Sequence, residues 1–130
     1  MISKVSWEDL SKKGNKLLSP SVKSNGHVFT SGCLGTDAEG NLPESVTEQT
    51  ENAIENLKEV LEASGSSLDK VLKVLLFVAD GKYAAEVNEV YKKYFTSQPA
   101  RSCVVVGFPN KAVKVELECI AEYLDLSAKL

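Results

Sequence analysis

The sequence predicts an α+β fold: a single mixed β-sheet with two helices packed on one face. Two segments place apolar residues at helical spacing, and each is flanked by segments rich in β-branched residues. The last segment, residues 113–123, alternates apolar and polar side chains, a period of two that only a strand satisfies. The order strand, helix, strand, helix, strand, strand favours one sheet whose helices cover the same side.

The first strand is expected at residues 26–31, which are rich in β-branched and aromatic side chains and run into Gly32. Asn25 and Gly26 form a hairpin signal at its start. A short earlier strand at residues 19–23 is therefore expected to pair with it. A turn follows, because the next residues are rich in glycine, aspartate and asparagine.

The first helix is expected to begin after Ser45, because Ser45 and Glu48 match a capping box in which each side chain satisfies a free amide. Gly65 follows as a C-terminal cap. A second helix is expected at residues 82–95, and both helices have one apolar face. The core-facing residues are predicted to be Val46, Ala53, Ile54, Leu57, Val60, Leu61, Ala84, Val87, Val90 and Tyr91.

Three further strands complete the predicted sheet. Residues 68–79 are apolar and β-branched, and both faces of their second half are expected to be buried. Residues 101–108 read as a strand until Pro109 turns the chain, and residues 113–123 should have one core face and one polar face. If apolar residues on the second face of the sheet are not covered within the chain, self-association is the natural way to bury them.

The composition of the chain excludes several classes of protein. The 130 residues fit one domain, residues 1–130, and the hydrophobic fraction of 43% and charged fraction of 25% are typical of globular proteins. The net charge of −3 with dispersed basic residues does not favour nucleic acid. Apolar runs are far shorter than the roughly 20 residues of a membrane helix. The N-terminal segment lacks the acid-poor, arginine-rich character of a transit peptide, so a cytoplasmic location is expected in preference to a mitochondrial one.

The cysteine and histidine residues give little indication of a metal site or a redox function. Cys33, Cys103 and Cys119 are odd in number and have no CxxC spacing, which argues against a disulfide framework and a structural zinc site. Reduced thiols are expected. His27 is the single histidine, which removes the usual histidine-rich metal sites. No metal site is predicted.

Arg101 is the first candidate functional residue. Arg101 and Cys103 lie two residues apart at the start of a predicted strand, so both side chains project to the same face. A fixed guanidinium presents a planar fork of donors that matches a carboxylate. The alternative for Arg101 is a surface ion pair, and the alternative for Cys103 is an inert buried thiol in place of a nucleophile.

Glu116 is the second candidate. It lies on the polar face of the last predicted strand, where a carboxylate could hold a water or move a proton beside an arginine-bound substrate. Glu118 and Glu122 share this face, so a solvated role is the alternative. From the residues alone, the sequence predicts a sheet that helices cover on one face, with an arginine that is a candidate for binding an anion.

Several motifs resemble those of the Rid family (reactive intermediate deaminases, YjgF-type). The most specific are residues 99–104 (PARSCV) followed by residues 113–121 (VKVELECIA). Thr30-Ser31-Gly32 and the pair Asn88 and Tyr91 add to the resemblance. It covers residues 19–123.

This resemblance implies a chorismate-mutase-like fold that forms homotrimers with ligand clefts between neighbouring subunits. Rid proteins hydrolyse reactive enamines and imines, such as 2-aminoacrylate and 2-iminobutanoate, to 2-oxo acids and ammonia without a cofactor or metal. By this resemblance, Arg101 would bind the substrate carboxylate and Glu116 would help to orient the attacking water. The implied substrate-binding residues are Arg101, Cys103, Gly32, Ser31, Ser21 and Asn88.

The chain also departs from the family pattern. Where deaminating members carry Gly-Pro-Tyr near the N-terminus, this chain has Leu18-Ser19-Pro20-Ser21, which puts Ser21 in the place of the active-site tyrosine. Cys33 stands where glutamine is usual. The alternative function is therefore a non-catalytic trimer that binds small carboxylates or regulates another process, including translation. A nuclease is the least favoured reading, because the chain is acidic.

Overall fold

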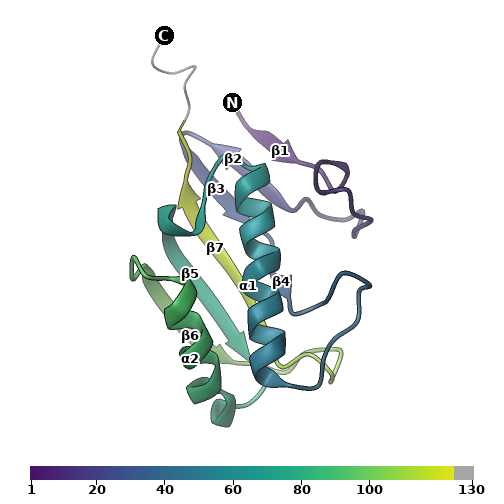
Figure 1. Ribbon diagram of the computed structural model, residues 1–130. Coiled ribbons are helices and arrows are strands. Elements are labelled where there is room, and N and C mark those ends of the chain that lie inside the picture. Colours follow the sequence, from purple (N-terminus) through teal and green to yellow (C-terminus); the bar gives the residue numbers. More distant parts are fainter. Residues whose placement is uncertain (125–130) are drawn as a thin grey trace.

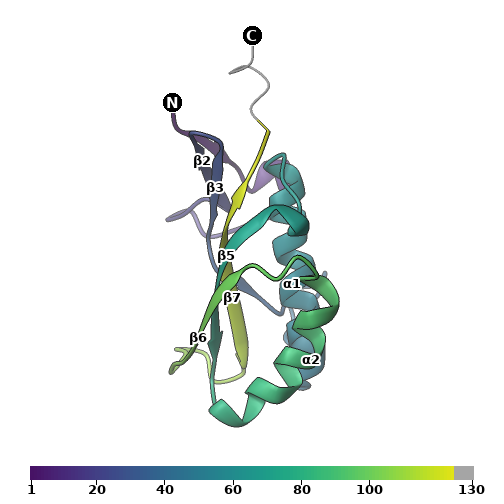
Figure 2. The ribbon, with the colours of Figure 1, turned by 90° about the vertical axis from the view of Figure 1, so that its left-hand side faces the viewer.

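The computed structural model describes residues 1–124 of the chain. These residues form one mixed sheet with the order β1-β2-β3-β7-β5-β6, and β4 pairs beside β7. Both helices lie on the same face of this sheet, as the edge-on view in Figure 2 shows. The predicted α+β fold is confirmed. The strands are β1 (Ser3–Val5), β2 (Ser21–Ser24), β3 (His27–Thr30), β4 (Cys33–Leu34), β5 (Val71–Val78), β6 (Ala100–Val105) and β7 (Val115–Glu122).

The hairpin β2–β3 forms where the sequence predicts it. Ser24 pairs with His27, and the two turn residues Asn25 and Gly26 have φ angles of 50° and 79°, as a two-residue hairpin of the favoured hand requires. The structure adds β1 at the outer edge of β2. The sequence did not predict β1 or β4, because strands of three and two residues are too short to show an alternating pattern.

Helix α1 (Val46–Ala63) begins at the predicted cap and crosses the sheet diagonally (Figure 1). The Ser45 hydroxyl accepts a hydrogen bond from the Glu48 amide at 3.2 Å. At the other end, Gly65 has a φ angle of 81°, in the left-handed region that a glycine after a helix commonly occupies. The face of α1 that packs on the sheet carries Val46, Gln49, Thr50, Ala53, Ile54, Leu57, Val60 and Leu61.

Strand β5, helix α2 (Ala84–Tyr94) and strand β6 form a crossover unit, and β5 and β6 are parallel. Residues 68–70 are a 3-10 turn, so the strand is shorter than the predicted range 68–79. The expectation that both faces of its second half are buried is not met within the single chain. Val74, Leu76 and Val78 are buried under the helices, whereas the alternate residues are partly open because no element within residues 1–124 covers their side.

Strand β7 lies between β3 and β5 and confirms the predicted alternation. Val115, Leu117, Cys119 and Ala121 are buried on the helix side. Strand β6 is an edge strand and ends at Val105, earlier than the predicted residue 108.

The face of the sheet opposite the helices is open in the single chain. Phe29 of β3 and Val104 of β6 lie on this face and are 46% and 43% exposed. Apolar side chains this exposed on a sheet face favour contact with another molecule.

Candidate functional site

Arg101 lies near the start of the edge strand β6, with its side chain on the helix side of the sheet. It pairs with the core residue Val74, and its Nη1 donates a hydrogen bond to Asn88 Oδ1 at 2.9 Å. The guanidinium lies 4.6 Å from the centre of the Tyr91 ring, close enough for a cation–π contact. These contacts fix the guanidinium from two directions and leave other N–H groups available to a ligand.

The ion-pair alternative for Arg101 is not seen. Within residues 1–124, no carboxylate forms an ion pair with its guanidinium. A cavity of about 410 Å³ adjoins Arg101, and residues of α2 and of the loop that precedes β6 form its walls. A charged group with donors to spare beside an open cavity is suited to binding an anion.

Asn88, Tyr91 and Cys103 surround Arg101 in different ways. Asn88 accepts from the guanidinium, so its amide supports the arginine. Tyr91 stacks on Phe95 with ring centres 4.4 Å apart, and sequence reasoning did not assign it a role in the site. The three-residue spacing of Asn88 and Tyr91 on a helix was the available signal. Cys103 is exposed, and its register partner Leu76 is buried, which agrees with the predicted shared face with Arg101.

Glu116 lies on the opposite, open face of the sheet. Its neighbours along β7, Val115 and Leu117, are buried under the helices, and Glu116 itself is half-buried. A Cβ atom added to Gly32 would lie 2.7 Å from Glu116 Oε2, so only glycine leaves room for the carboxylate here. Burial, and then the neighbouring Glu118, raise the pKa of Glu116. A raised pKa makes the carboxylate a stronger proton acceptor.

Arg101 and Glu116 do not come together within one chain. Strands β6 and β7 flank β5 on either side, with Arg101 beside Val74 and Glu116 beside Phe77. At about 4.8 Å between strands and about 3.3 Å per residue, the two Cα atoms are roughly 14 Å apart. Their side chains also point to opposite faces, so a small ligand cannot contact both within one protomer.

The remaining predicted residues lie near Glu116 or in the core. The Ser31 hydroxyl donates to the Ser19 carbonyl oxygen at 2.6 Å. Ser21, which the family resemblance places at the ligand site, has a buried side chain in the single chain. Ser21 is only 1% exposed, and its hydroxyl lies 2.7 Å from that of the buried Ser64, so a ligand cannot reach it without unpacking α1 from β2.

Cys33 and Cys119 are poor nucleophiles. Cys33 in β4 pairs with Leu117, and Cys119 is buried two residues further along β7. Burial, with a smaller contribution from Cys119, raises the pKa of the Cys33 thiol to about 12. Burial also raises the pKa of Cys119 to about 12. Both groups are therefore neutral thiols near pH 7.

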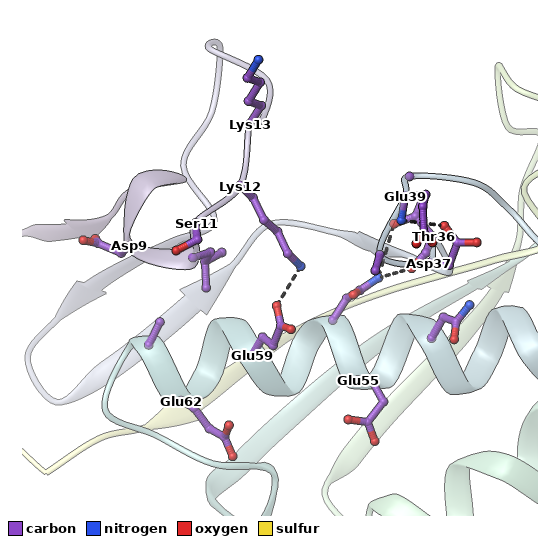
Figure 3. Close-up of a pocket in the computed structure, with 16 residues that line it drawn as sticks. Asp9, Ser11, Lys12, Lys13, Thr36, Asp37, Glu39, Glu55, Glu59 and Glu62 are labelled. Carbon is purple, nitrogen blue, oxygen red and sulfur yellow. Dashed lines mark hydrogen bonds and ion pairs between the residues drawn. The ribbon is translucent and has the colours of Figure 1, made fainter.

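A larger hollow of about 1030 Å³ lies on the outer face of α1, away from Arg101 and Glu116. It is bounded by the segment around Lys12, the loop around Asp37 and carboxylates of α1 (Figure 3). Lys12 forms an ion pair with Glu59 at 2.7 Å across this surface. The hollow is wide, mixed in charge and open to solvent, and no residue predicted for the site lines it.

Among residues 1–124, no helix is both long and apolar enough to cross a membrane.

The chain is similar in sequence to known proteins over most of its length. Residues 13–123 match the model of the family described as endoribonuclease L-PSP. The chain is 46% identical over 109 residues to Protein HMF1 of Saccharomyces cerevisiae, which covers 82% of this chain and 84% of that protein. It is 42% identical over 106 residues to Reactive Intermediate Deaminase A, chloroplastic, of Arabidopsis thaliana, which covers 79% of this chain and 57% of that protein.

A solved structure gives the same result for the fold. The crystal structure of Escherichia coli TdcF with bound serine superimposes with a TM-score of 0.84 at 31% identity, covering 94% of this chain and 100% of that one. The likeness therefore extends over almost all of the chain.

Proposed function

Because this chain belongs to the Rid family, the group that the endoribonuclease L-PSP model describes, we propose that it hydrolyses small imines and enamines that carry a carboxylate. The products are a 2-oxo acid and ammonia. The observation that carries the proposal is Arg101, a guanidinium braced by Asn88 and Tyr91 and open to a cavity. A guanidinium in this arrangement is suited to gripping a carboxylate bidentately.

The size of the proposed substrate follows from a relative. The TdcF structure contains bound serine, a small molecule with one carboxylate. Loss of water from serine gives 2-aminoacrylate, which keeps that carboxylate and tautomerises to an imine. We propose 2-aminoacrylate and 2-iminobutanoate as substrates, because Arg101 would hold the carboxylate and leave the imine carbon accessible.

The proposed reaction needs few groups from the protein. The enamine first takes a proton on carbon and becomes an iminium. Glu116 then accepts a proton from a water as the water oxygen attacks the iminium carbon. Glu116 returns this proton to the nitrogen of the carbinolamine, the carbon–nitrogen bond breaks and ammonia leaves. The hydroxyl on the same carbon loses its proton to solvent, and a carbonyl remains. Imines hydrolyse readily in water, so positioning and charge matching are sufficient without a covalent intermediate.

The proposed site lies between two copies of the chain. Arg101 and Glu116 face opposite sides of the sheet, so Arg101 of one copy would meet Glu116 of the next. The exposed Phe29 and Val104 on the open face support such a contact. A ring of three copies repeats this head-to-tail contact and closes, which is the homotrimer that the family resemblance implies. Sedimentation of the purified protein as a monomer would remove this site.

A coupled assay tests the proposed activity. A pyridoxal-phosphate-dependent dehydratase generates the imine, and its decay is followed with and without this protein. The wild type should accelerate the decay and Arg101→Ala should abolish the acceleration, since alanine removes every donor of the guanidinium that would hold the substrate carboxylate. Lys92→Ala is the matched control, because Lys92 borders the same cavity but pairs with Glu89. Equal decay with wild type and Arg101→Ala would end the proposal.

A second candidate function is a trimer that binds small 2-oxo acids without turnover and regulates another process, such as translation. The observation that favours it is Ser21, which stands in the place of the family tyrosine and is buried in the core. The hydroxyl of a tyrosine is therefore absent from the proposed site at that position. Thermal stabilisation by 2-oxobutanoate in the absence of imine turnover would support this function over the enzyme.

The compartment is a separate proposal. We expect a cytoplasmic protein. Relatives from Schizosaccharomyces pombe and Saccharomyces cerevisiae are named mitochondrial and the Arabidopsis relative is named chloroplastic, which indicates that family members occupy different compartments. Fractionation of cells that express a tagged full-length protein distinguishes the cytosol from an organelle.

A further inference from the structure

Three amide side chains project from one side of helix α1. Gln49, Asn52 and Asn56 follow each other at spacings of three and four residues, which brings them to the same side of the helix. Each donates hydrogen bonds to main-chain carbonyl oxygens outside the helix. Such bonds are costly to lose where they are buried, because the carbonyl oxygens then have no partner.

The first target of these amides is β4 and the turn after it. Asn56 Nδ2 donates to the carbonyl oxygens of Leu34 and Thr36 at 2.9 and 3.0 Å, and Asn52 Nδ2 donates to that of Gly35 at 3.2 Å. A Cβ atom on Gly35 would lie 2.3 Å from the main-chain oxygen of Gln49. The segment is therefore held directly against the helix, which supplies the partners that a two-residue strand lacks.

The second target is the start of β7. Gln49 is fully buried. Its Nε2 donates to the carbonyl oxygens of Pro43 and Ala112, both at 2.8 Å, and its Oε1 accepts from the amide of Lys114 at 2.9 Å. Lys114 precedes Glu116 by two residues, so Gln49 fixes the chain just before the carboxylate.

Both sets of bonds meet at Glu116. Leu34 is its register partner in β4, and Gly32, just before β4, leaves the space that the Glu116 carboxylate fills. We infer that Asn56 and Gln49 are positioning residues for Glu116: they hold β4 and the start of β7 from the helix side, and thereby fix the carboxylate on the opposite face of the sheet. The inference rests on the proposed function for its catalytic consequence, but its structural content can be tested without any substrate.

The mechanism predicts which property should change. Loss of the Asn56 bonds frees Leu34 and Thr36, so Gly32 moves away from Glu116 and water reaches the carboxylate. The charged or titratable groups that the register places on the open face with Glu116 are Glu118 and Glu122 on β7, Lys73 on β5, which is bonded to Ser102, His27 on β3 and Lys4 on β1. The substitution leaves all of them in place. The environment of Glu116 should therefore change through hydration alone, while the Arg101 end of the site stays intact.

The test compares Asn56→Ala with two other variants. Asn52→Ala removes only the bond to Gly35 and is the milder variant if Asn56→Ala does not fold. Ser64→Ala is the matched control, because it removes a buried hydroxyl contact from the far end of the same helix. The readouts are the NMR titration of the isotope-labelled Glu116 side-chain carboxyl and the kinetics of imine turnover.

We expect Asn56→Ala to move the Glu116 titration towards that of an ordinary glutamate, Asn52→Ala to move it less, and Ser64→Ala to leave it unchanged. In the imine assay, kcat of Asn56→Ala should fall about tenfold, as small displacements of a catalytic group cause, with KM nearly unchanged. An unaltered Glu116 titration in folded Asn56→Ala or Asn52→Ala would overturn the inference. A shifted titration in a protein that shows no imine turnover would keep the positioning role and reject the proposed function.

Discussion

The two ends of the proposed site are built in different ways. Arg101 lies on an edge strand, and side chains of α2 hold its guanidinium by one hydrogen bond and one ring contact. Glu116 lies on a central strand, and the closely apposed main chain at Gly32 confines its carboxylate. Both residues are partly buried. The first end borders a cavity and depends on two side chains, whereas the second depends on backbone placement.

This difference indicates what each end of the site can contribute to binding and to catalysis. A braced guanidinium that borders a cavity gives binding strength and orientation with little effect on folding. A half-buried carboxylate has a raised pKa, which suits proton transfer but costs stability when the group is charged. Substitutions at the Arg101 end should therefore alter substrate binding, and those at the Glu116 end should alter turnover and the pH dependence of stability.

The largest effect is expected for Glu116→Gln. Loss of the proton acceptor should lower kcat about 10²- to 10⁴-fold, the usual contribution of a general base, with little change in KM because Arg101 is retained. Steady-state kinetics of imine hydrolysis measure both constants. Glu118→Gln, a change of the neighbouring carboxylate on the same face, is the control and should have a much smaller effect. Similar losses in the two variants would deny Glu116 a specific role.

A smaller effect is expected for Arg101→Lys. Lysine keeps the charge but not the planar fork, so KM should rise about 10- to 100-fold. The free energy of unfolding should change by less than about 0.5 kcal/mol, since the residue is near the surface. Asn88→Ala, which removes the hydrogen-bond partner of Arg101, should raise KM in the same direction but less. A change in stability larger than the change in binding would contradict the open character of this end.

Gly32→Ala tests the backbone-dependent end. The new methyl group would meet the tip of the Glu116 side chain, which can move, so the free energy of unfolding should fall by no more than about 1 kcal/mol. The displaced carboxylate should lower kcat about tenfold. Gly107→Ala is the matched control, because a Cβ atom there meets nothing within 4 Å. Unchanged turnover in Gly32→Ala would show that the carboxylate needs no fixed position.

The smallest effect is expected in the pH dependence of stability. The pKa of Glu116 is raised in the folded protein, chiefly by burial, so the native state binds its proton more tightly than the unfolded chain does. Stability from this group therefore falls as pH rises from the ordinary glutamate value of 4.5 through the native pKa. Glu116→Gln cannot ionise, so its stability relative to wild type should increase over that range. Denaturant unfolding at a series of pH values measures the difference, and a difference independent of pH would contradict the burial.

The sequence predicted most of the fold, because its elements carry their own local signals. The capped helix after Ser45, the Asn25-Gly26 hairpin and the alternation in β7 each depend on residues close together in the chain. Strand β4 was missed because amides of α1, from residues such as Asn56, hold it in place. Contacts of this kind have no periodic signature.

The candidate site was only partly predictable. Alternation places Arg101 and Cys103 on one face, but the strand that contains them has apolar residues on both faces, so the pattern does not say which face meets the helices. The opposite orientation of Glu116 emerges only from the register of β5 with β6 and β7. Ser21 was placed by resemblance alone, and its contact with Ser64 joins residues that are distant in the sequence.

Mixing two inactive variants tests most directly the claim that the site is shared between copies. Arg101→Ala and Glu116→Gln are unfolded together, refolded as a mixture and compared with each variant refolded alone. If Arg101 of one copy acts with Glu116 of the next, about one quarter of the sites in a random mixture carry both intact residues, and a matching share of wild-type activity should return. If the mixture stays as inactive as the separate variants although hybrid oligomers have formed, the site does not lie between copies and the account is wrong.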